Sequence, residues 1–296
     1  MPLPRRRRPD PTPYVLIGPS LLVLIAVLAY PLGKVLVLST QHWGVSQIFS
    51  PAGPEFVGLD NYTQLLADAE FWTVLARTLV LTSVMAGASM LLGVAVALLM
   101  QRVAAWCRRT IVFALVLAWS VPTFISTEIF AWMTEYNSGV VNWALRITPY
   151  DWYGDATLGL TVATAIVVWG AVPLIAVTVY AGLVQIPPEL VEAARMDGAG
   201  SWTLFRHVTV PVLRPLLALL TTLSVIWDFQ VFNQIWILRH GAPASDYYTL
   251  GIYSYVKAYA GHDYGLASAG AVLTVLLLVG VMVVYLRQIT KIGDTP

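Results

Sequence analysis

Six long runs of apolar residues dominate this sequence and restrict the folds open to it. Each run is long enough for an α-helix to cross a bilayer core of about 30 Å, which takes roughly 20 residues. Hydrophobic residues make up 58% of the chain and charged residues 11%, which excludes a soluble enzyme or a disordered chain. We therefore predict an all-α polytopic membrane protein with about six transmembrane helices. The runs cover residues 14–39, 74–100, 110–133, 158–184, 213–237 and 265–287.

The distribution of basic residues predicts that both termini are cytoplasmic. Arg5 to Arg8 precede the first run, whereas the outer loop 40–73 contains Asp and Glu but no Lys or Arg. We expect a basic cytoplasmic N-terminus at 1–13, a transmembrane domain at 14–287 and a cytoplasmic tail at 288–296. The other basic residues of the predicted cytoplasmic segments are Arg102, Arg108, Arg109, Arg195, Arg206, Arg214, Arg287 and Lys291.

The chain lacks the residue patterns of common catalytic and metal sites. Cys107 is the only cysteine, and the four histidines are far apart in the sequence, so we expect no metal site. No HExxH, GxSxG or nucleotide-binding P-loop pattern occurs, so we expect no catalytic residue and no cofactor in this chain. Because the arginine run lies beside a spanning helix, we interpret it as a membrane anchor, with no nucleic-acid partner.

The inner loop 185–212 contains residues that start and end helices, which predicts a folded segment. Pro187 and Pro188 predict the start of a short helix, and Gly198 predicts its end. Ser201 is expected to cap a second short helix that ends at Pro211. The alternative is an amphipathic connector that lies on the lipid surface.

Three short motifs in this loop are spaced along the chain as they are in a known protein family. They are Glu192-Ala193-Ala194, Asp197-Gly198-Ala199 and Val210-Pro211-Val212. With them the chain resembles the inner-membrane permease subunits of binding-protein-dependent ABC importers, in particular the maltose-type sugar permeases. In that family this EAA loop docks as a coupling helix into a cleft of the cytoplasmic ATPase. The resemblance implies an ATPase-coupling role for Glu192, Ala193, Ala194, Asp197, Gly198 and Ala199.

The resemblance extends over most of the chain, with some departures. Phe56 to Tyr62 is similar to the family's outer segment before the second span, and Gly182-Leu183 leads into the EAA loop as it does there. Trp132, Gly139 and Asn142 resemble its third outer region. The departures are Arg77 in place of Asn before Thr78-Leu79, Phe232-Asn233 in place of Phe-Asp, and Arg239-His240-Gly241-Ala242-Pro243 in place of a Thr-rich Gly-Gly-Pro stretch.

The resemblance implies a transmembrane permease subunit of an ATP-driven, binding-protein-dependent sugar importer that works by alternating access. Its partners would be a second permease subunit, two ATPase subunits, an extracytoplasmic solute-binding protein, the lipid bilayer and the sugar. ATP and magnesium would bind the ATPase, and the chain would lie in a bacterial or archaeal cytoplasmic (inner) membrane. The alternatives are import of glycerol phosphate or another polar solute, an ion-coupled secondary transporter, and a membrane-embedded enzyme.

Polar residues of the fifth run predict a substrate path. Asp228 falls near the bilayer midplane, where an ionisable group is costly and indicates a pathway or a buried partner. The predicted path consists of Thr221, Ser224, Asp228, Gln230, Asn233 and Gln234. The alternative is a hydrogen-bonded cluster that joins this span to the partner permease. Tyrosines in 247–264 are expected either to contact the sugar or binding protein or to lie at the membrane interface.

Overall fold

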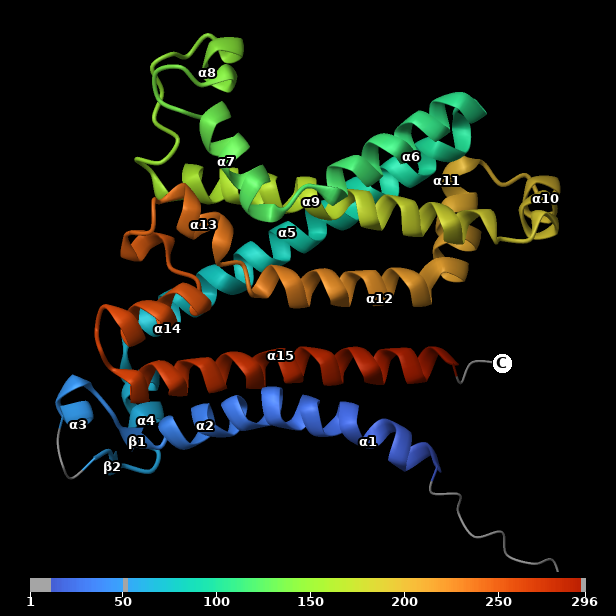
Figure 1. Ribbon diagram of the computed structural model, residues 1–296. Coiled ribbons are helices and arrows are strands. Elements are labelled where there is room, and N and C mark those ends of the chain that lie inside the picture. Colours follow the sequence, from blue (N-terminus) through green and yellow to red (C-terminus); the bar gives the residue numbers. More distant parts are fainter. Residues whose placement is uncertain (1–11, 50–52, 294–296) are drawn as a thin grey trace, which may run out of the picture. The chain divides into compact units, whose positions relative to one another are not determined.

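The structure of the chain, a computed structural model, describes residues 12–49 and 53–293. It is predominantly helical (Figure 1). In the described part, five helical segments are long and apolar enough to cross a bilayer, or up to six when a bent pair is counted as one span. The prediction of an all-α polytopic membrane protein is therefore confirmed. Arg5 to Arg8, and residues 294–296 of the predicted tail, lie outside the described residues.

The chain divides into two compact units. Unit 1 comprises residues 1–67 and 254–273, and unit 2 comprises residues 68–253 and 274–296. The first span of unit 1 is a continuous helical segment made of α1 (Thr12–Leu24), the π-helical η1 (Ile25–Ala29) and α2 (Tyr30–Leu38). After it come β1 (Gln41–His42), α3 (Val45–Phe49), β2 (Glu55–Phe56) and α4 (Asp60–Ala67). The two strands pair antiparallel, with Gln41 opposite Phe56.

Asn61 ties the start of α4 to the end of the first span within unit 1. Its buried Nδ2 donates to the carbonyl oxygens of Ser39, at 2.9 Å, and Gln41, at 3.0 Å. The hydroxyl of Tyr62 donates to Ser39 Oγ at 2.6 Å. Gly265, near the start of α15 (Tyr264–Gly293), approaches the same backbone, and a Cβ there would overlap the Gln41 carbonyl oxygen. Glycine is therefore required at this close approach.

Unit 2 contains the remaining spans before α15. They are α5 (Ala69–Arg102), the pair α6 (Ala105–Ser120) and α7 (Thr123–Met133), α9 (Ala156–Val184), and the segment Ser201–Leu238. The last segment consists of α11 (Ser201–Leu204), η2 (Phe205–Thr209), α12 (Val210–Phe229) and α13 (Asn233–Leu238). The shorter elements are α8 (Val140–Leu145), α10 (Pro188–Met196), η3 (Ser245–Tyr247) and α14 (Leu250–Tyr259), whose last residues belong to unit 1.

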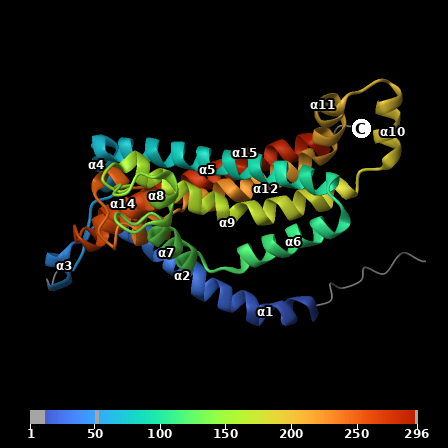
Figure 2. The same cartoon turned by 90° about the horizontal axis from the view of Figure 1, so that it is seen from above.

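Helices α5, α9 and α12 pack side by side and form the core of unit 2 (Figures 1 and 2). Small residues on α5 allow the close approach, because helices in lipid associate through backbone proximity and van der Waals packing. The buried small residues of α5 include Ala86, Ser89, Gly93 and Ala97. One buried cluster joins all three helices and contains Ala97, Ile175, Val179, Leu183, Leu213 and Leu220.

Two of the predicted spans are broken helices. Helices α6 and α7 meet at Val121–Pro122 with a bend of 98°. Helix α12 ends at Phe229, and α13 starts at Asn233 after a short non-helical break. Irregular backbone at membrane depth is tolerated where it is buried in protein or lines a cavity. Both breaks therefore mark places where a cavity is expected.

The predicted end of the second loop helix at Pro211 is wrong. The helix that begins at Ser201 continues through η2 into α12, and Pro211 occupies the first turn of α12. Proline is tolerated inside this continuous segment because the π-helical turn η2, directly before α12, adjusts the backbone hydrogen bonding around the missing N–H. The predicted cap by Ser201 is also wrong, since Gly200 is the N-cap residue and no side chain caps this helix.

Candidate functional site

The segment between α9 and α11 folds as a helical elbow around α10. Pro188 is in the first turn of α10, as predicted, and Asp197 is the C-cap residue. The N–H of Asp197 donates to the Ala193 carbonyl at 3.0 Å, and the N–H of Ala199 donates to the Ala194 carbonyl at 2.9 Å. Gly198 has a φ of +81°, a conformation that side chains with a Cβ rarely adopt. These contacts turn the chain sharply from α10 toward α11.

The elbow is exposed along most of its length. No residue of α10 is buried, and Met196 is 89% exposed. The predicted coupling residues fall in one short stretch of this surface: Glu192, Ala193, Asp197 and Gly198 are exposed, and Ala194 and Ala199 are half-buried. Most of the predicted coupling residues are therefore accessible to another protein.

A groove of about 990 Å³ separates the elbow from the ends of the spans. Arg102 and Arg108 line it from the α5–α6 turn, and Glu192 and Arg195 line it from α10. Arg108 has a structural role, since its Nε donates to the Met100 carbonyl at 2.9 Å. Arg108 therefore satisfies one of the free carbonyl groups at the end of α5.

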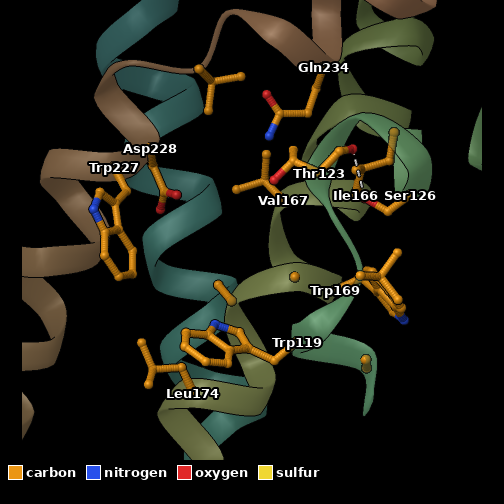
Figure 3. Close-up of a pocket in the computed structure, with 15 residues that line it drawn as sticks. Trp119, Thr123, Ser126, Ile166, Val167, Trp169, Leu174, Trp227, Asp228 and Gln234 are labelled. Atoms are coloured by element: carbon orange, nitrogen blue, oxygen red, sulfur yellow. Dashed lines mark hydrogen bonds between the residues drawn. The ribbon is translucent and has the colours of Figure 1, made fainter. Parts of the chain in front are cut away.

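A second cavity, of about 260 Å³, lies where the two broken spans meet the middle of α9. The α6–α7 break contributes Trp119, Thr123 and Ser126, and the α12–α13 segment contributes Asp228 and Gln234. Figure 3 shows the side chains of Asp228 and Gln234 pointing toward the same space, with the ring of Trp119 at one end of it. We call this cavity the central pocket. Its complete lining is Ala118, Trp119, Val121, Thr123, Ser126, Ile166, Val167, Trp169, Gly170, Ala171, Leu174, Trp227, Asp228, Val231 and Gln234.

Only some residues of the predicted substrate path line the central pocket. Asp228 and Gln234 line the central pocket, and Ser224 lies buried one turn before Asp228 on the same face of α12. Thr221, Gln230 and Asn233 are exposed and do not line it. The hydroxyl of Thr221 donates to the Leu217 carbonyl of its own helix at 2.8 Å.

Most of the pocket's other polar and aromatic residues were missed by sequence reasoning. Trp119, Thr123 and Ser126 lie on either side of Pro122, which is a signal that a helix breaks there. Trp169 lies in the middle of an apolar run and gives no such signal. Its contribution depends on the packing of α9 against α7, where its ring meets that of Phe130 edge to face, with centroids 5.9 Å apart.

A hydrogen-bonded cluster joins the end of α13 to the start of α9. Arg239 Nη1 donates to the Tyr153 carbonyl at 3.0 Å, and the Tyr247 hydroxyl donates to the same oxygen at 2.8 Å. The Arg239 guanidinium lies 4.6 Å from the centre of the Tyr247 ring, a cation–π contact. Burial raises the pKa of Tyr153 and that of Tyr247. The Arg239 departure from the family pattern thus has a structural role.

The tyrosines of the predicted outer region do not share one environment. Tyr247 and Tyr253 are buried, and the Tyr253 hydroxyl donates to Asp68 Oδ2 at 3.0 Å. These two side chains are therefore internal, which the sequence did not predict. Tyr259 is exposed. Among residues 12–49 and 53–293, no cluster of His, Cys, Asp and Glu could hold a metal ion.

Two curated relatives are similar to the chain along nearly its whole length. The diacetylchitobiose uptake system permease protein DasB of Streptomyces coelicolor is 36% identical over 285 residues, which cover 94% of this chain and 87% of the relative. The trehalose/maltose transport system permease protein MalF of Thermococcus litoralis is 32% identical over 279 residues, 93% of this chain and 92% of the relative. Both are permease proteins of transport systems, as predicted for this chain.

The fold is also similar to that of a solved transporter. A chain of a bacterial ABC transporter involved in the import of the acidic polysaccharide alginate superimposes with a TM-score of 0.79, at 19% identity. The superposition covers 95% of this chain and 96% of the other. A family model described as "binding-protein-dependent transport system inner membrane component" matches residues 89–292. Like its relatives, the chain is a permease subunit and not an enzyme. It therefore belongs to the family of binding-protein-dependent transport system inner membrane components.

Proposed function

We propose that this chain is one membrane-spanning half of an ATP-driven importer of a sugar, and that the central pocket lies on the sugar's path. The observation that carries the proposal is the position of the central pocket on two broken spans, with polar groups and indole rings in its lining. Transporter binding sites commonly form on discontinuous helices near the bilayer midplane. Indole faces suit the apolar face of a pyranose ring, while Asp228 and Gln234 suit its hydroxyl groups.

The connection between the elbow and the central pocket supports a coupling role for α10. Helix α9 leads from pocket residues at 166–174 directly to the elbow, and the segment from α11 to α12 leads back to Asp228. In Figure 1, α10 lies at one end of α9, and α7 and α13 lie at the other. A displacement of α10 is therefore passed through continuous helices to two sides of the pocket, as rigid-body alternating access requires.

The remaining assembly follows from this proposal. The partners are a second permease subunit, two ATPase subunits that bind ATP and magnesium, and an extracytoplasmic solute-binding protein. Both termini and α10 face the cytoplasm of a bacterium or archaeon, which agrees with the basic residues of that side. Residues Glu192, Ala193, Ala194, Asp197, Gly198 and Ala199 contact the ATPase. The proposal keeps the domain limits 1–13, 14–287 and 288–296.

Reconstituted transport tests the proposal. The complex with its partner subunits and binding protein is placed in liposomes, and uptake of labelled mono- and disaccharides and of sn-glycerol 3-phosphate is measured. We expect sugar uptake that needs both ATP and the binding protein. Trp119→Ala should raise the apparent KM about tenfold, which corresponds to about 1.4 kcal/mol, because it removes one wall of the pocket.

Phe113→Ala is the matched control, because Phe113 is an exposed aromatic residue of α6 that does not line the pocket. Uptake driven by an ion gradient without ATP would replace the proposal with a secondary transporter. Uptake of sn-glycerol 3-phosphate alone would replace the sugar with the alternative solute. An equal effect of both α6 substitutions would remove the pocket from the path.

A further inference from the structure

Asp228 has a carboxylate that is buried without a partner in the described structure. The residue is 5% exposed, and its Oδ2 has no hydrogen-bond partner among the described residues. Its side chain points into the central pocket, toward the space that Gln234 also reaches (Figure 3). Burying a carboxylate is strongly unfavourable unless a donor or a cation compensates it. The missing donor is therefore expected to enter the pocket from outside this chain.

The central pocket has a negative electrostatic character. None of its lining residues, all of which the structure describes, is Lys, Arg or His, so no counter-charge balances Asp228 there. The lining also includes Trp119, Trp169 and Trp227, and an indole ring attracts a cation that lies over its face. Electrostatic interactions of the buried Asp228 carboxylate are also stronger than those of a carboxylate in water.

From these observations, we propose that the central pocket selects sugars by their charge. A sugar with a protonated amino group binds best, a neutral sugar binds less well, and a uronate or a sugar phosphate is rejected. The proposal rests on the proposed function, and it names the substrate class of the same pocket. An ammonium group supplies both N–H donors and the positive charge that Asp228 lacks, whereas hydroxyl and amide groups supply donors alone. A carboxylate or phosphate supplies neither and is repelled.

Direct binding tests the proposal without the selectivity of the binding protein. Labelled chitobiose, which has two free amino groups, N,N′-diacetylchitobiose, which is neutral, and digalacturonate, which is acidic, are each titrated against the purified complex in detergent by equilibrium dialysis. We expect the affinity to fall in that order. In Asp228→Asn the ratio of the chitobiose and diacetylchitobiose affinities should fall by about tenfold.

Two further variants separate a charge effect from a structural one. Asp228→Glu keeps the carboxylate and should keep the order of affinities. Asp246→Asn removes the carboxylate of an exposed residue of η3, outside the pocket, and should leave the affinities unchanged. The proposal is overturned if wild type binds the three sugars equally or prefers digalacturonate, or if Asp228→Asn keeps the wild-type ratio of the chitobiose and diacetylchitobiose affinities.

Whether the permease subunits stay assembled in the Asp228 variants is the second measurement that decides the proposal. If Asp228→Asn separates the permease subunits on gel filtration while Asp228→Glu does not, Asp228 pairs with a cation of the partner subunit, and the charge-selection proposal is wrong. The proposed function is tested separately by the uptake assay. If the complex imports diacetylchitobiose but its affinities for the three sugars do not follow their charge, only the present inference fails. If it imports no sugar at all, the proposed function fails.

Discussion

Gly93 of α5 lies so close to Ile175 of α9 that a Cβ on Gly93 would overlap the Ile175 side chain. This contact lies within the buried small-residue face of α5, between Ser89 and Ala97. Residues 166–174 of α9 line the pocket, and α9 packs against α5. The close contact between the two helices therefore helps to hold these pocket residues in place.

Enlarging Gly93 should destabilise the α5–α9 contact. Gly93→Val places side-chain atoms where Ile175 lies, and overpacking of this kind typically costs about 1–3 kcal/mol. We expect a lower midpoint of thermal unfolding for the purified complex. Gly87→Val is the matched control, because Gly87 is on the exposed side of the same helix with no atom near its Cβ position. Equal midpoints for the two variants would contradict a packing role for Gly93.

The spans were predictable because their signal is local. An apolar run of sufficient length determines a spanning helix almost by itself, and each of the six predicted runs corresponds to a helical span or a broken one. The breaks were less predictable, since proline is an ambiguous signal in a membrane helix. Pro173 and Pro215 lie inside continuous helices, whereas Pro122 marks a 98° bend. The break after Phe229 contains neither proline nor glycine.

The candidate site was predictable only for the residues of one span. Asp228 and Gln234 could be selected because polar groups stand out in an apolar run. Trp119, Thr123 and Trp169 join them through contacts between helices far apart in the sequence, which no local pattern encodes. Thr221 illustrates the opposite error. Its spacing from Ser224 and Asp228 fits a helical face, but the buried face at this level runs through Leu220, Ser224 and Asp228.

Adding bulk to the elbow should uncouple ATP hydrolysis from transport. Ala194 is half-buried on the exposed α10, and Ala194→Arg adds a long charged side chain to the surface proposed to meet the ATPase. We expect the number of sugar molecules transported per ATP hydrolysed to fall by more than tenfold, because the added side chain disturbs the contact with the ATPase while ATP hydrolysis continues. The measurement is the number of sugar molecules transported per ATP hydrolysed in liposomes.

Thr203→Arg serves as the control for this experiment, because it adds the same side chain to an exposed position of α11 outside the motif. Wild-type coupling in Ala194→Arg would refute the assignment of the coupling surface. Gly198→Leu is a second variant, expected to lower coupling because leucine rarely adopts a φ of +81°.

Replacing Asn142 should unfold the segment between α7 and α9. Asn142 is fully buried, and its Nδ2 donates to the carbonyl oxygens of Glu135, at 3.0 Å, and Tyr150, at 3.0 Å. Its Oδ1 accepts from Trp152 Nε1 at 2.6 Å. Asn142→Asp replaces the donor with an oxygen that faces these carbonyls, so we expect a loss of about 2 kcal/mol or more in local stability.

Hydrogen–deuterium exchange of residues 134–155 measures this loss. Exchange should become faster in Asn142→Asp and stay unchanged in Asn137→Asp, which alters an exposed residue of the same segment. Similar exchange in wild type and Asn142→Asp would show that the segment does not depend on this side chain.

Removing Arg77 should release the segment 245–250 from α5. Arg77 Nη1 donates to the carbonyl oxygens of Ser245, at 3.0 Å, and Tyr248, at 2.9 Å, and the neighbouring Thr78 Oγ1 accepts from the N–H of Leu250 at 3.0 Å. Arg77→Met keeps the apolar stem and removes both donors, at a cost of about 1–3 kcal/mol. We expect faster hydrogen–deuterium exchange in 245–250, with Arg102→Met as the control that removes an arginine from the other end of α5. Thr78→Val should add to the effect, because it leaves the Leu250 N–H buried without an acceptor. Unchanged exchange in the Arg77→Met, Thr78→Val double variant would mean that packing alone holds the segment against α5.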